Sequence, residues 1–375
     1  HWRVRLDHGT LGRNVRLGGE RGDMGPLFAH LEAYLRVGGQ TVWDRGQASA
    51  LLAPVARPLP QARRAPRPVL VDGALHLVGG QEREGYGFTV PDVLRLDADT
   101  GEWTRLATLP SIPITSAGAF GPSVSPEILI GYEVAAVGRR VFVLGGTTIK
   151  IGQRLATTLI LDVDAAAWTV GPALPGPLFD RKAVVAGGAL HLVPTSHVRP
   201  AGDTDRAYVL DAGAGAWRTA PVRGLDLLVG ERYVTAAHDG RLLFLGGRTP
   251  GHAGQALNDA LAYDARTGAV TRVGNCSADL TGVEPAAVIG GQVLIGNVEP
   301  DLGRGDAAAL LFDPLAGDAT RLPRGPLLPF EAALAPAPAP LVAGPGGVNP
   351  RRVHAAFVLT GASRVDTWSP EHGAL

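Results

Sequence analysis

Charged and hydroxyl-bearing side chains stand directly before short apolar segments at intervals along this 375-residue sequence. In chain order, these junctions supply Arg63, Arg64, Tyr132, Glu133, Asp180, Arg181, Glu231, Arg232, Glu284 and Arg351. An arginine can hold an anion through two parallel hydrogen bonds, and a carboxyl group can accept or donate a proton. If the junctions converge in space, they can line a pocket for a small polar or anionic molecule.

The three glutamates, Glu133, Glu231 and Glu284, are the candidate acids and bases of such a pocket. Carboxylates that crowd together at a poorly hydrated site acquire raised pKa values, which suits proton transfer. The other seven junction residues are candidate ligand contacts. A plainer interpretation is that these charges sit at strand ends in water or neutralise a neighbouring module.

The sequence argues against several other chemistries. Cys276 is the only cysteine, which excludes an internal disulfide and a multi-cysteine metal site. His197, Asp203 and Asp205 lie close together, but the set lacks a diagnostic metal-ligand spacing. No phosphate-binding glycine motif stands out, because the glycine pairs belong to a repeat. We therefore expect no metal and no organic cofactor.

The elements that would position these residues repeat along the chain. Seven times a bulky residue is followed by aspartate at the end of an apolar run, at Trp43-Asp44, Leu96-Asp97, Leu161-Asp162, Leu210-Asp211, Tyr263-Asp264, Phe312-Asp313 and Val365-Asp366. The successive aspartates are 53, 65, 49, 53, 49 and 53 residues apart. A period of about 50 residues that runs from one end of the chain to the other predicts a repeat architecture.

The clearest copy of the unit runs from residue 69 to residue 110. Two apolar runs joined by Asp72-Gly73 form a hairpin pattern, and the second run ends at Gly79-Gly80. A third run ends at Asp97, and Trp103 opens a fourth run after a turn. The pattern predicts a four-stranded antiparallel meander. In it, glycine supplies positive φ angles, aspartate accepts turn amides and tryptophan packs between sheets.

This unit resembles the kelch repeat: a double glycine after an apolar strand, a bulky residue–Asp pair about 16 residues later, and a tryptophan six residues after that. The resemblance implies an all-β fold, a β-propeller whose loops on one face surround a central channel with a ligand site. Bacterial sialic-acid mutarotases of kelch type are the nearest functional model, which implies a cofactor-independent isomerase, cyclase or epimerase. A protein-interaction scaffold and a non-catalytic carbohydrate-binding protein are the alternatives.

We predict one domain over residues 1–375 with seven four-stranded blades, at roughly 14–60, 69–110, 134–175, 183–221, 234–275, 286–323 and 351–375. Six blades is the alternative, which applies if the first copy is irregular. The last copy lacks a tryptophan strand after Asp366, and residues 1–8, with Trp2, have the form of that strand. The amino-terminal strand is therefore expected to complete the last blade and close the ring.

Composition bears on the partners of this protein. Lysine plus arginine and aspartate plus glutamate both number 35, so no bulk field recruits nucleic acid or an anionic membrane. The apolar stretches are too short, and too often interrupted by glycine and proline, to span a bilayer. We expect a monomer that binds a small molecule, with a protein partner as the alternative. The sequence begins at His1, so export and a cytoplasmic location both stay open.

Overall fold

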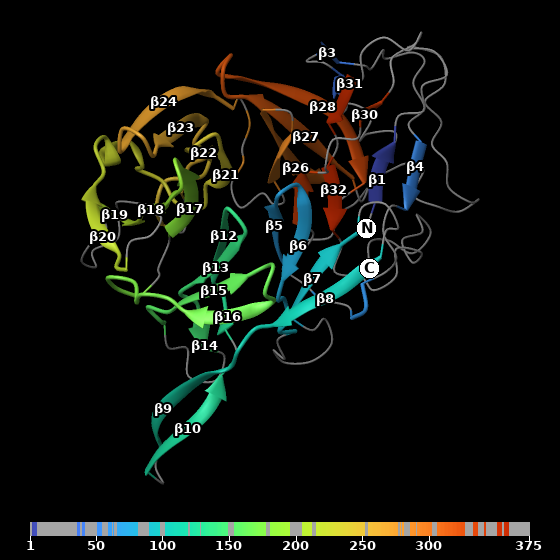
Figure 1. Ribbon diagram of the computed structural model, residues 1–375. Coiled ribbons are helices and arrows are strands. Elements are labelled where there is room, and N and C mark those ends of the chain that lie inside the picture. The colour runs from blue at the N-terminus through green and yellow to red at the C-terminus, as the bar shows by residue number, and fades with distance from the viewer. Residues whose placement is uncertain are drawn as a thin grey trace.

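Five antiparallel sheets, each made of four strands that pair in chain order, stand around a common centre in the computed structural model (Figure 1). The structure describes residues 59–326 apart from gaps at 62, 64–65, 82–89, 98–101, 119–120, 128, 149–153, 178–180, 196–204, 212–214, 252–253, 277, 279, 281–285, 290 and 302–305. Outside this range it describes strands at 2–5, 36–37, 40–41, 51–54, 333–336, 341–342, 351–354 and 356–359. The predicted all-β propeller with four-stranded blades is thus confirmed.

Each blade is a meander in which neighbouring strands pair in chain order. Blade 1 consists of β5 (Arg67–Val71), β6 (Ala74–Val78), β7 (Asp92–Leu96) and β8 (Trp103–Thr108). Blade 2 consists of β12 (Glu133–Val137), β13 (Arg140–Leu144), β15 (Thr158–Asp162) and β16 (Ala167–Val170). Blade 3 consists of β17 (Arg181–Ala186), β18 (Ala189–Pro194), β19 (Arg206–Leu210) and β20 (Arg218–Pro221).

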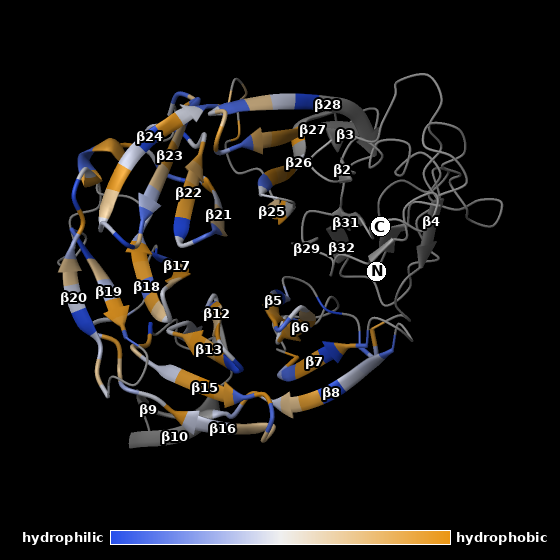
Figure 2. Cartoon of the chain, turned by 45° about the horizontal axis from the view of Figure 1, so that its top comes forward, coloured by the Kyte–Doolittle hydropathy of each residue, from blue (hydrophilic) through white to orange (hydrophobic). Residues whose placement is uncertain are grey.

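The remaining two blades follow the same plan. Blade 4 consists of β21 (Val234–His238), β22 (Arg241–Leu245), β23 (Asp259–Asp264) and β24 (Ala269–Asn275), and blade 5 consists of β25 (Ala286–Ile289), β26 (Gln292–Asp301), β27 (Asp306–Asp313) and β28 (Asp318–Pro326). The first strand of every blade lies nearest the centre and the fourth lies at the periphery (Figure 2). Along this inner ring β12 contacts β5 and β17, and β21 contacts β17 and β25.

Local sequence signals explain the shape of each blade. At the hairpin between β5 and β6, Asp72 and Gly73 have φ angles of 47° and 78°, as a tight two-residue turn requires. Asp162, at the end of β15, accepts hydrogen bonds from the amides of residues 164 and 165, both at 3.0 Å. Asp264 and Asp313 hold the equivalent turns in blades 4 and 5. The predicted turn-forming role of the repeated aspartates is confirmed.

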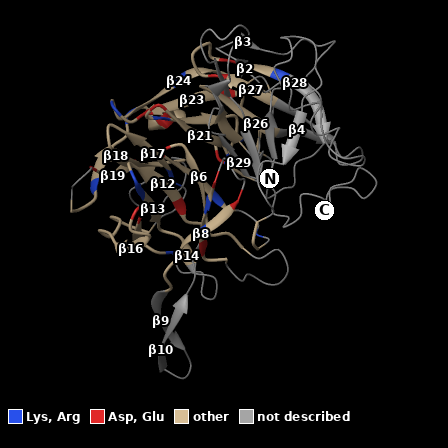
Figure 3. Ribbon diagram, turned by 45° about the vertical axis from the view of Figure 1, so that its right-hand side comes forward, with Lys and Arg blue, Asp and Glu red and all other residues tan. Residues whose placement is uncertain are grey.

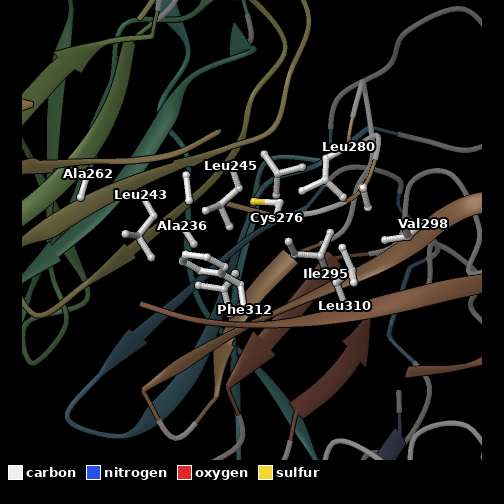
Figure 4. Close-up of a cluster of buried hydrophobic side chains, with 14 residues drawn as sticks. Ala236, Leu243, Leu245, Ala262, Cys276, Leu280, Ile295, Val298, Leu310 and Phe312 are labelled. Carbon is white, nitrogen blue, oxygen red and sulfur yellow. The ribbon is translucent and has the colours of Figure 1, made fainter. Parts of the chain in front are cut away.

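The apolar core lies between neighbouring blades. Figure 4 shows one such cluster, in which Leu243 and Leu245 of blade 4 face Ile295 and Phe312 of blade 5, with Cys276 among them. All five side chains are buried. Burial raises the pKa of the Cys276 thiol to about 12, so at neutral pH it is an uncharged core residue. Because each blade shares its core with the next, the ring is stabilised by contacts between modules.

The predicted number of blades is wrong, because the structure shows five blades where we expected seven, or six as the alternative. Two further four-stranded sheets combine strands from both ends of the chain and are not meanders of consecutive strands. They are β29-β32-β1-β4 and β3-β2-β31-β30, built from β1 (Trp2–Arg5), β2 (Arg36–Val37), β3 (Gln40–Thr41), β4 (Leu51–Pro54), β29 (Ala333–Pro336), β30 (Leu341–Val342), β31 (Arg351–His354) and β32 (Ala356–Leu359).

The misleading signal in the first expected copy is the glycine pair Gly38-Gly39. Val37 pairs with Gln40, so the strands on either side of this pair belong to one hairpin, and β2 also pairs with β31. A glycine pair suits a hairpin turn as well as the end of a second strand. Sequence pattern alone does not distinguish the two uses.

The predicted closure of the ring by residues 1–8 is also wrong. β1 was expected as the outer strand after Asp366, but it lies between β32 and β4, where Trp2 is opposite Val358 on one side and Pro54 on the other. The expected neighbour, residues 364–366, lies outside the described residues. The Trp2 segment has the pattern of a strand, but the pattern does not specify which edges it pairs with. The expectation of one domain over residues 1–375 stays a prediction.

A long hairpin extends away from the ring between blades 1 and 2 (Figure 1). It is formed by β9 (Ile112–Gly118) and β10 (Gly121–Glu127), which pair along their whole length. A short sheet of β11 (Leu129–Ile130) and β14 (Thr147–Thr148) follows it, and η2 (Leu225–Leu227) is a single 3-10 turn. Within the described ranges, no helix is long and apolar enough to cross a membrane.

Candidate functional site

The end of each blade at which its first strand begins is called the entrance end here. Because the strands are antiparallel, the second strand ends there and the third begins there. The charged residues of the blades are coloured in Figure 3, where they interrupt a ribbon that is mainly uncharged. Six predicted site residues are described at this end: Arg63, Tyr132, Glu133, Arg181, Glu231 and Arg232.

The other four predicted residues are not part of this group. Arg64, Asp180 and Glu284 lie outside the described residues, so their proposed roles stay predictions. Arg351 is the first residue of β31 and pairs with Val342 in one of the two sheets that combine the chain ends. The structure therefore does not place Arg351 in any of the five blades.

Arg63 and Tyr132 hold the edge of blade 1 together. Nη1 of the fully buried Arg63 donates to the backbone oxygens of Gly79 and Asp92, both at 3.1 Å. Burial lowers the pKa of this guanidinium, although the nearby Asp92 opposes the shift. Tyr132 donates its hydroxyl to the Val78 oxygen at 3.1 Å, and burial raises its pKa to about 12. Both side chains thus satisfy backbone carbonyls.

Arg181 plays the same part in blade 3. Its side chain is buried, and Nη1 donates to the backbone oxygens of Leu192 and Arg206, at the end of β18 and the start of β19. The guanidinium carbon lies 3.8 Å from the centre of the Tyr208 ring, a cation–π contact within blade 3. Sequence reasoning placed Arg63 and Arg181 correctly at equivalent junctions, but their observed contacts stabilise the sheet.

Glu133 links two neighbouring inner strands. Its carboxylate accepts a hydrogen bond from Lys182 Nζ at 3.3 Å and from the Ala183 amide at 3.4 Å, which ties β12 to β17. The Glu133 side chain is 16% exposed and the Lys182 side chain 33%. This pair is neither fully solvated nor fully buried, so an incoming anion can reach the ammonium group without opening the core.

Glu231 forms the second partly exposed pair of the entrance end. Its Oε1 accepts hydrogen bonds from Arg248 Nε at 3.2 Å and Nη2 at 3.0 Å. The two backbones also bond in both directions, at 2.8 and 3.0 Å. The side chains are 22% and 21% exposed. Arg232 next to it is exposed and has a φ of 57°, a conformation that non-glycine residues seldom adopt.

Sequence reasoning missed Arg67, which is the first residue of β5 and lies half-buried. Among the described residues, Arg67 has no hydrogen bond and no ion pair. Its strand contacts β12, whose first residue is Glu133. Arg67 and Lys182 precede the predicted starts of their blades, at residues 69 and 183, but we did not include them among the junction residues. The available signal was a cation at the first or second position of an otherwise apolar inner strand.

Arg67, Glu133 and Lys182 therefore stand at the first or second position of three adjacent inner strands, with one acidic residue between two cations. Within the described ranges, no group of three or more His, Cys, Asp or Glu side chains is placed to hold a metal ion. Comparison with protein-family models gives no match, and comparison with curated proteins gives none either. The propeller fold rests on the structure, and the kelch resemblance stays a prediction.

Proposed function

We propose that this propeller binds a small anionic metabolite at the entrance end, where Arg67 and Lys182 hold the acidic group. The observation that carries the proposal is the half-buried guanidinium of Arg67, which has no partner among the described residues and stands one inner strand away from the Glu133–Lys182 pair. These three residues comprise two cations and one acidic residue. A partly buried, unpaired arginine suits a carboxylate or phosphate ligand.

Sugar acids fit this site by their chemistry. The carboxylate takes Arg67 and Lys182, while Glu133 accepts hydrogen bonds from ring hydroxyls. The resemblance of the repeat to that of sialic-acid mutarotases points to the same ligand class. If turnover occurs, Glu133 or Glu231 is the base, because each has a partly exposed carboxyl group beside a cation at the entrance end.

Binding is tested by isothermal titration with N-acetylneuraminate, glucuronate and neutral glucose. We expect Arg67→Gln to weaken binding of the acids by about tenfold or more, since a hydrogen bond to a charged group contributes about 1.5–3 kcal/mol. Arg105→Gln is the control, because its guanidinium is 68% exposed on the outer strand β8. Equal affinity of the Arg67 variant for the acids, or equal binding of glucose, would contradict the proposal.

Catalysis is tested separately by following the interconversion of sugar-acid anomers with NMR. Glu133→Gln and Glu231→Gln should slow the enzyme-dependent rate while the thermal denaturation midpoint changes little. A wild-type protein that binds the acid without accelerating the interconversion is a binding protein, and the isomerase part of the proposal then fails.

The β9–β10 hairpin favours a second candidate, a protein-interaction scaffold. In the described part of the chain these two strands pair only with each other, so each offers a free edge to another strand. The sequence from Ile112 to Pro126 contains no charged residue that would discourage such pairing. Sedimentation velocity of the protein with and without residues 113–126 tests for self-association through this hairpin. An unchanged monomer in both forms argues against a second copy as the partner.

A further inference from the structure

A cavity of about 480 Å3 lies between blades 2 and 3, at the end of the ring opposite the entrance end. It is bordered by the turn between β12 and β13, by the start of β18 and by the ends of β15 and β19. Its apolar wall includes Phe142, Ile160, Leu190 and Leu210. The volume is in the range of small-molecule sites, and nothing in the proposed function involves this place.

Comparison of equivalent positions shows that blade 2 lacks, at this cavity, a contact that blades 4 and 5 make. In blade 4, the first residue of the second strand, Arg241, bonds to the last residue of the third strand, Asp264, at 3.4 Å. In blade 5, Gln292 bonds to Asp313 in the same way, at 2.7 Å. In both blades the turn amides donate to Oδ1 of the aspartate, and the side chain of the second strand donates to Oδ2.

Blade 2 has the residues for the same contact but does not make it. Arg140 and Asp162 stand opposite each other in the register of β13 and β15, and both line the cavity. Oδ1 of Asp162 accepts two turn amides, as the equivalent aspartates of blades 4 and 5 do. Within the described residues, the Arg140 guanidinium has no hydrogen bond or ion pair, and neither has Oδ2 of Asp162. A matched cation and anion thus face one cavity without bonding to each other.

The remaining charges at the cavity are already engaged. Arg139 binds both oxygens of Asp164 and also Asp72, and Asp211 pairs with Arg218 at 3.0 and 3.3 Å. The charges left for a ligand are therefore one guanidinium and one carboxylate oxygen beside an apolar wall. A simple anion would pair with the Arg140 guanidinium, but it would lie beside the acidic Asp162 without a favourable contact to Oδ2.

We propose that this interblade cavity binds a free α-amino acid with a large apolar side chain. Arg140 takes the α-carboxylate, Oδ2 of Asp162 takes the ammonium group, and the side chain lies on Phe142, Leu190 and Leu210. A zwitterion is the smallest ligand that satisfies both unpaired groups, and the apolar wall contributes through burial of the side chain. No backbone rearrangement is required, because both polar groups already border the cavity.

Isothermal titration of the whole chain with L-phenylalanine tests the inference, with three probes that each lack one feature. These are 3-phenylpropanoate without the ammonium group, 2-phenylethylamine without the carboxylate, and glycine without the apolar body. We expect one molecule of phenylalanine to bind per chain, and each incomplete probe to bind about tenfold more weakly or worse. Absence of phenylalanine binding, or an incomplete probe that binds as tightly, overturns the proposal.

Substitutions then locate the site. Arg140→Gln should weaken phenylalanine binding by about tenfold or more, whereas Arg241→Gln at the equivalent position of blade 4 should leave it unchanged. Equal losses in the two variants would overturn the assignment. Arg67→Gln separates this site from the entrance end. If this variant no longer binds phenylalanine, the amino acid binds at the entrance end and the cavity inference fails. If it loses only sugar-acid binding, the cavity inference stands.

Discussion

Trp217→Phe should expose how strongly neighbouring blades depend on a single buried hydrogen-bond donor. Trp217 immediately precedes β20 of blade 3, and its side chain is 9% exposed. The indole Nε1 donates to Thr158 Oγ1 and to the Pro172 oxygen, both at 3.1 Å and both contributed by the chain of blade 2. The tryptophan of one blade therefore fixes the position of the preceding blade.

The expected cost follows from these contacts. Phenylalanine removes the donor, which loses about 0.5–1.5 kcal/mol of net hydrogen-bond stabilisation. In the parent protein the Thr158 hydroxyl, which is 1% exposed, accepts a hydrogen bond from the indole Nε1–H. Loss of this donor leaves a buried hydroxyl oxygen without it, which costs about 1–3 kcal/mol. The smaller ring leaves some space as well. Together these effects lower the free energy of unfolding by about 2–4 kcal/mol.

Trp168→Phe is the matched control, because Trp168 follows Asp162 by the same six residues as Trp217 follows Asp211. Its Nε1 is buried and has no acceptor among the described residues. Removing an unsatisfied donor relieves a cost that offsets the lost packing, so we expect a change within about 1 kcal/mol.

Urea unfolding followed by far-ultraviolet circular dichroism measures both variants without relying on tryptophan fluorescence. The free energies are comparable where the dependence on urea has the same slope as in the parent protein. The reasoning is refuted if Trp217→Phe costs no more than Trp168→Phe, because the hydrogen bonds would then contribute nothing beyond ring packing.

Three further perturbations test the turns and the core. Gly79→Ala should lower the thermal denaturation midpoint more than Gly73→Ala. Both glycines have positive φ (59° and 78°), but an added Cβ would clash with Tyr132 Oη at Gly79, whereas it would meet nothing within 4 Å at Gly73. Burial opposes ionisation of Asp264, but turn amides and an arginine outweigh burial and lower the pKa of this carboxyl group. The stability that the ionised Asp264 contributes is therefore present above the unfolded pKa of about 3.9 and is lost as pH falls through the lower folded value. Asp264→Asn should consequently lose less stability than the parent protein between about pH 4 and pH 2. Cys276, with its pKa raised to about 12 by burial, should resist iodoacetamide at pH 8 until the protein unfolds, and rapid labelling of the native protein would contradict its placement in the core.

The blade could be predicted from sequence because its determinants are local. Asp72-Gly73 specifies a tight turn within two residues, and the aspartates cap turns whose amides lie two and three residues onward. Positive φ at Gly79, Gly145 and Gly246 follows from the same pattern. Each of these signals is complete within one copy of the repeat, so five copies sufficed to establish the meander.

The number of blades could not be predicted in this way, because it depends on pairing between distant segments. Trp2 stands opposite Val358 in one register and Pro54 in another, and no local pattern encodes either choice. A strand pattern specifies alternation of side chains but leaves both hydrogen-bonding edges open. The two ends of this chain use that freedom, and their strands join in mixed sheets.

The candidate site could be predicted only in part, because its contacts also join segments that are far apart in the sequence. Six of the ten predicted residues are described at one end of the blades, yet the partners observed there are backbone oxygens and cations far away in sequence, as Arg63 with Asp92 and Glu133 with Lys182 illustrate. Arginine at a junction can bind a ligand or bind the sheet, and only the positions of neighbouring carbonyls decide between them. Arg67 shows a second kind of error, a cation near a junction that we did not include among the candidate residues.

A repeat protein offers an internal control, because residues at equivalent positions of other blades show which contacts such a side chain makes when it only stabilises the fold. Arg241 and Gln292 show that the first residue of the second strand ordinarily bonds to the capping aspartate. Arg140 has the same position and the same side chain as Arg241, yet it makes no bond to Oδ2 of Asp162, beside a cavity between blades 2 and 3. A contact that blades 4 and 5 make and blade 2 does not make is stronger evidence for a ligand than the presence of a charge alone.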